Sequence, residues 1–201
     1  MRAWIYDRAI RPLTGQWYAE VLGRLPSSAR VLDVGIGTAG ALLENGDLLR
    51  HKGICVTGVD IDADYVKRAR TAVWKKGLAE RVEVLLESVY DHDGGPYDAV
   101  YFSASFMLMP DPSGALRHVS TLLGDEGRIY FTQTFQERRS SFTERAKPLL
   151  KKITTVDFGR VTYETDFLDV LDEGNMEVLE FTTMQRQGAR SFRLAVTRPR
   201  A

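Results

Sequence analysis

The sequence predicts an α/β fold: a doubly wound, mostly parallel sheet of seven strands with helices on both faces and a C-terminal antiparallel hairpin. Three observations support this fold class. Apolar runs alternate with helical patterns from residue 29 to residue 135, the first run ends in a glycine-rich turn, and only a short polar segment separates the last two β-like runs. Strands that alternate with helices form right-handed crossovers, which place parallel strands between two layers of helices.

The first half of the chain supplies three strands and two helices. Each strand is a short apolar run, and the helical spacing of apolar side chains between Tyr65 and Val73 marks the second helix. Asp62 is a better N-cap candidate for that helix than Asp60. The expected strands are 29–34, 54–60 and 82–87, and the expected helices are 39–50 and 63–76.

The second half continues the alternation and then departs from it. Asp111-Pro112 is a helix-start signal, and Gly174-Asn175 is a helix-stop signal. The last two β-like runs are joined by residues 185–190, a connection too short for a parallel crossover, so they are expected to pair as an antiparallel hairpin. The expected strands are 99–103, 128–132, 176–183 and 191–197, and the expected helices are 113–123, 144–152 and 165–173.

The length of 201 residues fits a single domain. Residues 1–28 precede the first strand and are expected to form a helical lid over the ligand edge of the sheet, in which Trp17 and Tyr18 serve as packing. Residues 29–135 are expected to form the cofactor-binding core. Residues 136–201 are expected to form the substrate-side segment and the final hairpin.

Composition narrows the classes of partner. Lys+Arg and Asp+Glu balance at 27 each, so the chain as a whole makes no electrostatic case for nucleic acid or an anionic membrane. No apolar stretch could span a bilayer and no secretory signal is visible, which makes the cytoplasm the expected location. The single cysteine, Cys55, lies in an apolar run and is expected in the core. His51, His92 and His118 lack metal-ligand spacing, so no metal site is expected, and all three are interpreted as surface or cap residues.

The first apolar run ends in Asp33 and the glycine-rich turn, and the second ends in Asp60. Gly35-x-Gly37-x-x-Gly40 fits a dinucleotide site, with Asp60 as the ribose-binding acid. Asp33 argues against that interpretation, because a carboxylate at the turn repels a pyrophosphate anion. A cationic ligand would be attracted by it. A nicotinamide-linked oxidoreductase therefore remains only as an alternative.

This stretch resembles the first motif of the class I, Rossmann-like S-adenosylmethionine-dependent methyltransferases, acid-x-Gly-x-Gly-x-Gly, with Ala39 at the third glycine position. Asp60 matches the acid that ends the second strand, and Ser88-Val89 stands where the family usually has an Asp-Ala-like pair. The strand-four element 97–103 and the Gly124–Gly127 turn follow in order. The resemblance covers about residues 29–135 and implies the strand order 3-2-1-4-5-7-6.

The resemblance also implies roles at the ligand edge. Asp33 would favour the ammonium or sulfonium end of the cofactor, and Asp60 would accept hydrogen bonds from both ribose hydroxyls. Ile61 would pack on adenine. For Ser88, an adenine contact and a hydrogen bond within the local turn are equally weighted interpretations. Ser103 is interpreted more as a strand-end hydroxyl than as a catalyst. Ser103 would face the methyl-transfer zone, and Tyr6 would close over the methionine moiety. The implied cofactor-binding residues are Asp33, Gly35, Ile36, Gly37, Asp60, Ile61, Ser88, Val89, Ser103 and Tyr6.

The implied activity is methyl transfer from S-adenosyl-L-methionine to a small organic acceptor, with S-adenosyl-L-homocysteine as the product. No residue stands out as a catalytic base. Ser103-Ala104-Ser105-Phe106 lacks the Asn/Asp-Pro-Pro-Tyr pattern of base-amine enzymes, so no nucleic-acid partner is expected, and the acids that would hold magnesium are missing after strands four and five. Ala39 and Ser88 depart from the family pattern. These departures leave an alternative function, that of a partner subunit that binds the cofactor without catalysing methyl transfer. The sequence leaves the oligomeric state open.

Overall fold

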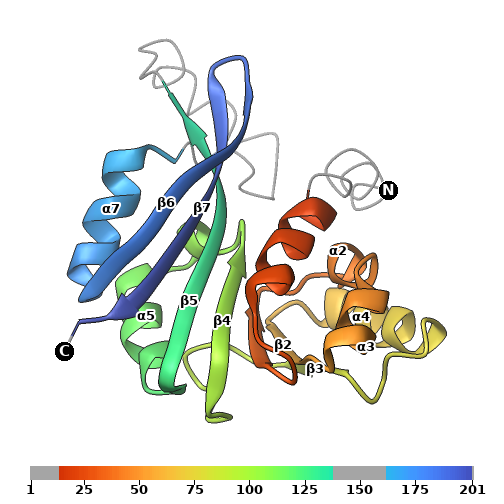
Figure 1. Ribbon diagram of the computed structural model, residues 1–201. Coiled ribbons are helices and arrows are strands. Elements are labelled where there is room, and N and C mark those ends of the chain that lie inside the picture. Colours follow the sequence, from red (N-terminus) through yellow and green to blue (C-terminus); the bar gives the residue numbers. More distant parts are fainter. Residues whose placement is uncertain (1–13, 138–161, 201) are drawn as a thin grey trace.

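The computed structural model describes residues 14–137 and 162–200. It contains a seven-stranded sheet in the order β3-β2-β1-β4-β5-β7-β6, which confirms the predicted order (Figure 1). The strands are β1 (Arg30–Val34), β2 (Cys55–Asp60), β3 (Val82–Leu86), β4 (Tyr97–Ser103), β5 (Leu123–Gln136), β6 (Met176–Gln187) and β7 (Arg190–Pro199). The helices are an N-terminal helix at 14–24, α2 (Gly40–Leu43), α3 (Gly46–Lys52), α4 (Ala63–Lys75), the 3₁₀ helix η1 (Phe106–Leu108), α5 (Pro112–Ser120) and α7 (Glu164–Glu173).

The first five strands run parallel, and the last two form the predicted hairpin. Strand β7 pairs antiparallel with both β5 and β6. Only Gly188 and Ala189 separate the two hairpin strands, and Gly188 has a φ of 59°, a left-handed conformation that glycine adopts without a steric penalty. The hairpin therefore closes on the far side of β5 and continues the sheet there.

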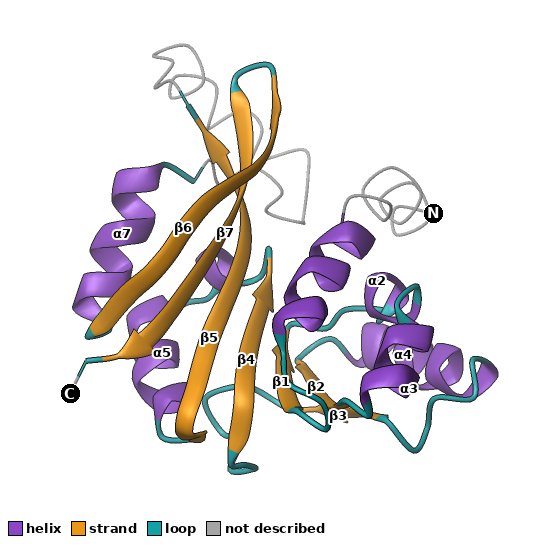
Figure 2. Ribbon diagram, viewed as in Figure 1, coloured by secondary structure: helices purple, strands orange, loops and turns teal. Residues whose placement is uncertain are grey.

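Helices lie on both faces of the sheet (Figure 2), and an apolar cluster fills the space on each face. The N-terminal helix, α2, α3 and α4 pack on one face, where Val21, Leu49 and Ala69 are fully buried. Helices α5 and α7 pack on the other face around an aromatic cluster that includes Phe131 and Phe167. Burial of apolar side chains on both faces is what a mostly parallel sheet requires.

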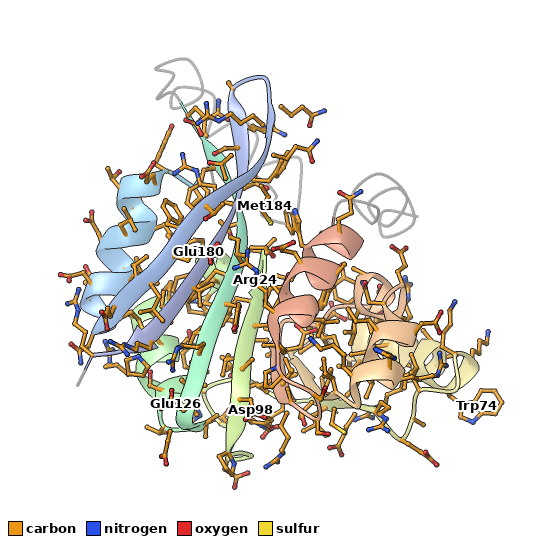
Figure 3. All side chains as sticks on the ribbon, viewed as in Figure 1. Arg24, Trp74, Asp98, Glu126, Glu180 and Met184 are labelled. Atoms are coloured by element: carbon orange, nitrogen blue, oxygen red, sulfur yellow. The ribbon has the colours of Figure 1, made fainter. Side chains whose placement is uncertain are left out.

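An ion pair links the N-terminal helix to the hairpin. Arg24 lies 2.6 Å from Glu180 on β6 and 2.7 Å from Glu20 one turn earlier in its own helix (Figure 3). Half-exposed ion pairs contribute little stability, about 0–1 kcal/mol. This pair joins the helix to β6, and the same helix places Trp17 against Phe192 on β7 and the Tyr18 hydroxyl against Asp33 at the end of β1.

The helix expected at 39–50 is interrupted. The Asn45 side chain donates to the carbonyl of Ala41, 3.1 Å away, and to that of Gly15 in the N-terminal helix, 2.9 Å away. A side chain that bonds nearby backbone competes with the helical ladder, so α2 ends and α3 starts at this residue. Further along, Asp62 caps α4 by accepting from the backbone of Asp64 and Tyr65, as predicted.

Strand five is longer than predicted. It starts at Leu123, so the Gly124–Gly127 segment belongs to the strand, opposite a register shift between Tyr97 and Ala99. It continues to Gln136 because β7 pairs with it from Ile129 to Gln136. Pairing with a strand distant in sequence decided this boundary, and local composition could not show it.

Two interpretations of single residues were wrong. Cys55 is exposed, because it is the first residue of β2 and its side chain lies outside the core. His92 is buried: its Nδ1 lies 3.0 Å from Glu87 Oε2 and its Nε2 lies 2.8 Å from the Tyr97 hydroxyl. Both ring nitrogens have partners, which is why this histidine can lie in the core. His51 is exposed, as expected, and His118 is half-buried.

Candidate functional site

The glycine-rich turn lies at the carboxyl ends of β1 and β2. The amides of Gly35 and Ile36 donate to the Val59 carbonyl, at 2.9 and 3.3 Å. Gly35 and Gly37 have φ angles of 76° and 60°, and Ala39 adopts 59° without being glycine. The turn of the motif thus keeps its left-handed conformation although alanine replaces its third glycine, and this conformation strains the backbone of the alanine.

The two motif glycines have different surroundings. A Cβ on Gly35 would lie 2.7 Å from the Cβ of Ser105, so this position must be glycine for the segment after β4 to approach. A Cβ on Gly37 would meet nothing within 4 Å. Open space above a strand-end turn is where a ligand can approach the backbone.

Asp60 joins the turn to the start of α4. Its Oδ2 accepts from the Gly37 amide and its Oδ1 accepts from the Asp62 amide, both at 2.9 Å. The side chain is half-buried. Because each carboxylate oxygen has a further lone pair, Asp60 can still accept from hydroxyl groups of a ligand.

An apolar surface lies beside Asp60. Ile61 is 77% exposed and Leu86, at the end of β3, is 53% exposed. Large apolar side chains at the ends of neighbouring strands offer a flat surface to the ring of a ligand. The predicted residues Ile61 and Asp60 therefore lie at one edge, as the pattern requires.

The other predicted adenine-side residues are arranged differently. The Ser88 hydroxyl accepts from the Tyr90 amide at 3.3 Å, which is the local turn bond given as its alternative role. The side chains of Val89 and Ile36 are both 5% exposed and pack in the core, Ile36 against Gly58. Only the backbone of these two residues can meet a ligand while their side chains stay in the core.

Asp33 is the deepest acid of the site. It is 1% exposed, and the Tyr18 hydroxyl donates to its Oδ2 at 2.7 Å. Its Oδ1 has no hydrogen-bond partner among the described residues. Burial raises the pKa of Asp33 to about 7, the hydrogen bond from Tyr18 opposes this shift, and the charge of Asp60 adds to it.

A row of hydroxyl groups continues from Asp33 across the sheet. The ring of Tyr18 meets Tyr101 edge to face at 4.9 Å, and the Tyr101 hydroxyl lies 2.7 Å from Thr132 Oγ1 on β5. Burial raises the pKa of both tyrosines, and the nearby charge of Asp33 raises it further. Ser103 is the last residue of β4 and lies two residues after Tyr101, so it belongs to the same face of the sheet.

Sequence reasoning missed Tyr18 and Tyr101 as polar members of the site. Tyr18 packs as expected, but its hydroxyl also contacts Asp33. One signal was present for Tyr101: it alternates with Ala99 and Ser103 and pairs in register with Asp33, so all four belong to one face. Nothing in the sequence indicated that the N-terminal helix brings a hydroxyl to Asp33.

Some predictions lie outside the described residues, among them the proposed contact of Tyr6. In the two described ranges, no group of three or more histidine, cysteine and acidic side chains could hold a metal ion. No helix in the described part of the chain is both long and apolar enough to cross a membrane.

Comparison with known proteins gives a consistent result. Residues 6–192 match the family described as a methyltransferase domain. The ubiquinone biosynthesis O-methyltransferase of Alkalilimnicola ehrlichii is 32% identical over 125 residues, which are 61% of this chain and 48% of that protein. The S-adenosyl-L-methionine-dependent Diels-Alderase iliD of Neonectria sp. is 25% identical over 164 residues, 79% of this chain and 62% of that protein.

The fold comparison agrees with the sequence comparison. The crystal structure of the [4+2]-cyclase SpnF superposes with a TM-score of 0.72 at 18% identity, covering 96% of this chain and 82% of that one, a likeness of fold alone. The chain spans about half the length of the ubiquinone biosynthesis O-methyltransferases it matches.

Proposed function

Because this chain belongs to the methyltransferase-domain family, in its class I, S-adenosylmethionine-dependent form, we propose that it transfers a methyl group from S-adenosyl-L-methionine to a small organic acceptor. The observation that carries the proposal is the pair of acids at the glycine turn. Asp33 lies buried before the turn, and Asp60 accepts from its Gly37 amide. The charge of Asp60 disfavours a pyrophosphate at this position, and Asp33, once ionised, favours a ligand with a cationic end.

The family assignment removes the nicotinamide-linked alternative. A dinucleotide site would need the backbone donors of the turn for phosphate oxygens. Here the Gly37 amide already donates to Asp60, and the Gly35 and Ile36 amides donate to Val59.

The residues present fit the cofactor in three places. Asp60 would accept from the ribose hydroxyls, and the exposed side chains of Ile61 and Leu86 would cover the adenine ring. The unpartnered Oδ1 of Asp33 would accept from, or attract, the ammonium end. The open space over Gly37 would admit the cofactor to the backbone of the turn.

The chemistry asks little of the protein beyond positioning. The sulfonium group of the cofactor supplies an activated methyl group and a good leaving group. The site holds the acceptor atom and the methyl carbon in line and excludes water, and such alignment can remove about 7–11 kcal/mol of barrier. Asp33 and Tyr18 are already bonded to each other, so we assign neither as a catalytic base.

Two features support a small acceptor. Met107 and the 58% exposed Leu108 lie just beyond β4, where the methyl-transfer zone is expected, and offer an apolar wall. Gln133 on β5 donates through Nε2 to Thr162, 3.2 Å away, while its Oε1 has no partner in the described ranges. An apolar wall with few polar groups is typical of sites for small organic molecules.

A non-catalytic, cofactor-binding partner subunit is the second candidate, favoured by the departures at Ala39 and Ser88. The first of these leaves the turn intact, since Ala39 keeps the left-handed conformation.

Calorimetry with S-adenosylhomocysteine and with NADH tests the cofactor. We expect micromolar binding of the first and none of the second, and the reverse result would contradict the proposal. Incubation with methyl-labelled S-adenosylmethionine and a library of small phenols, amines and carboxylic acids tests turnover. Binding without transfer to any of them would favour the partner subunit.

A further inference from the structure

We propose that Asp33 holds a proton in the free protein, that Tyr18 positions this acid, and that a ligand carrying an ammonium group at the glycine turn displaces the proton into solution. This inference rests on the proposed function, because it concerns how the same site receives its cofactor. It goes beyond that function by assigning a proton to the binding step and a role to the N-terminal helix.

In the part of the chain that the structure describes, the surroundings of Asp33 contain no compensating cation. Tyr18 reaches it from the N-terminal helix, and Tyr101 lies beside it on β4. On β2 its register partner is Gly58, and the nearby charge on that strand is the acid Asp60. Among the described residues, no lysine, arginine or histidine pairs with Asp33.

The hydrogen bonding of Asp33 is half complete. Tyr18 satisfies Oδ2, whereas Oδ1 is buried without a partner among the described residues. A buried carboxylate that lacks both a counter-charge and full hydrogen bonding is strongly disfavoured, and protonation is the usual relief. The raised pKa of about 7 agrees with this geometry.

The proton balance follows directly. In the free protein the Asp33 carboxyl group keeps its O–H bond. When a ligand ammonium arrives, that bond breaks, the proton passes to solvent, and the carboxylate remains paired with the ammonium. A cation near a carboxylate lowers its pKa, so the bound form stays ionised. Affinity for such a ligand should therefore fall towards tenfold for each pH unit below about 7.

Tyr18 acts as a positioning residue in this scheme. Its hydroxyl donates to Oδ2, which stabilises the ionised form and keeps the pKa of Asp33 lower than burial alone would set it. Without that bond, Asp33 would stay protonated up to a higher pH. At pH 7 a larger fraction of the protein would then have to release this proton when the ligand binds.

Calorimetry in two buffers of different ionisation enthalpy that both buffer between pH 6 and 7, phosphate and Bis-Tris, counts the released protons. For S-adenosylhomocysteine we expect about half a proton per ligand at pH 7 and about 0.9 at pH 6. 5′-Methylthioadenosine is the matched control ligand, because it keeps the adenosine and the thioether but lacks the ammonium. It should bind with no proton release.

Two variants separate positioning from a merely structural role. Tyr18→Phe should move the midpoint of the affinity–pH profile to higher pH and increase the protons released at pH 7. Asp33→Asn should abolish release. Tyr130→Phe is the control, because it removes the hydroxyl of another buried tyrosine on the same sheet face that has no contact with Asp33. A structural effect of Tyr18→Phe would weaken binding equally at every pH and would overturn the assignment.

The outcomes distinguish this inference from the proposed function. If S-adenosylhomocysteine binds with the same heat in both buffers between pH 6 and 7, Asp33 holds no proton and the inference fails, while the proposed cofactor stands. If neither the wild type nor Tyr18→Phe binds S-adenosylhomocysteine, the proposed function fails and the inference with it.

Discussion

Gly37 and Asp60 are 23 residues apart, yet the amide of the first donates to the carboxylate of the second at 2.9 Å. The glycine turn after β1 and the end of β2 are thereby one unit. An acid that the sequence marks as a ligand group is also part of the frame that holds the turn.

Replacing this acid should weaken ligand binding and also loosen the turn, because asparagine keeps only one of the two oxygens that accept from the Gly37 and Asp62 amides. Asp60→Asn keeps the size of the side chain but removes the charge that strengthens its bonds to ribose hydroxyls. We expect the Kd for S-adenosylhomocysteine to rise about 10- to 100-fold, the effect of losing ~1.5–3 kcal/mol of charge-assisted bonding. Calorimetry measures it. Asp62→Asn is the control, since Asn caps helices about as well as Asp, and an equal loss there would contradict the ribose role.

The two motif glycines should respond differently to alanine. Gly35→Ala places a Cβ 2.7 Å from that of Ser105 at a φ of 76°, so the free energy of unfolding should fall by about 2–4 kcal/mol. Gly37→Ala meets open space, so it should lose only about 1–2 kcal/mol from its backbone conformation. Urea unfolding compares the two.

For ligand affinity, the alanine substitution at Gly37 should have a larger effect than the one at Gly35. The Cβ of Gly37→Ala would occupy the space that the proposed cofactor needs, so its affinity should fall about tenfold or more. Unchanged affinity in Gly37→Ala would argue that the ligand does not approach the turn from this side.

Replacing the alanine at the third glycine position of the motif with glycine should increase the stability of the protein. Ala39→Gly relieves a left-handed alanine, worth about 1–2 kcal/mol, while the added freedom of the unfolded chain removes about 0.4–1 kcal/mol of that. We expect a net increase of about 0.5–1 kcal/mol in the free energy of unfolding, measured in urea. Ala41→Gly, within helix α2, is the comparison and should lose about 1 kcal/mol. A loss at position 39 would show that no strain is stored there.

The stability of the free protein should depend on Asp33 near neutral pH. Its pKa is about 7 when folded and about 3.9 when unfolded, so between these values the folded state binds the extra proton. The contribution of this group is fully present below pH 4 and is lost as pH rises through 7, with a slope of up to about 1.4 kcal/mol per pH unit. Urea unfolding from pH 5 to 8 should show a fall that Asp33→Asn lacks. Parallel curves would contradict it.

Arg193 should stabilise the end of the sheet more than an exposed arginine does. It lies 2.9 Å from Glu137 and 2.8 Å from Glu164, over the rings of Phe135 and Phe181, and its side chain is 11% exposed. Arg193→Met should lower the free energy of unfolding by about 1–3 kcal/mol. Arg198→Met breaks only the exposed pair with Glu177 and should lower the free energy of unfolding clearly less. Thermal unfolding of the two variants compares them.

The positions of the glycine turn and its two acids were predictable because strand ends obey local rules. An apolar run that ends in an acid, with glycine after it, can be recognised without knowledge of distant contacts, which is why Asp33, Gly37 and Asp60 were found. The inward orientation of Ile36 and Val89 was not found, since it depends on which face of the turn packs against its neighbours. The break at Asn45 was missed for a related reason: part of its bonding is to Gly15, thirty residues earlier.

The sequence by itself determined the family and the places of the glycine turn and its two acids, because motif spacing is a local property of the chain. The strand order was implied by the resemblance to that family. Only the tertiary structure decided how far β5 extends, that His92 is buried, and that the Tyr18 hydroxyl faces Asp33. The length of β5 and the contact of Tyr18 depend on segments far apart in sequence that meet in the fold. The burial of His92 depends on how its own loop folds, since the side-chain partners Glu87 and Tyr97 are each five residues away. The protonation of Asp33 belongs to this second group, since it follows from what surrounds the acid and from the counter-charge missing among the described residues.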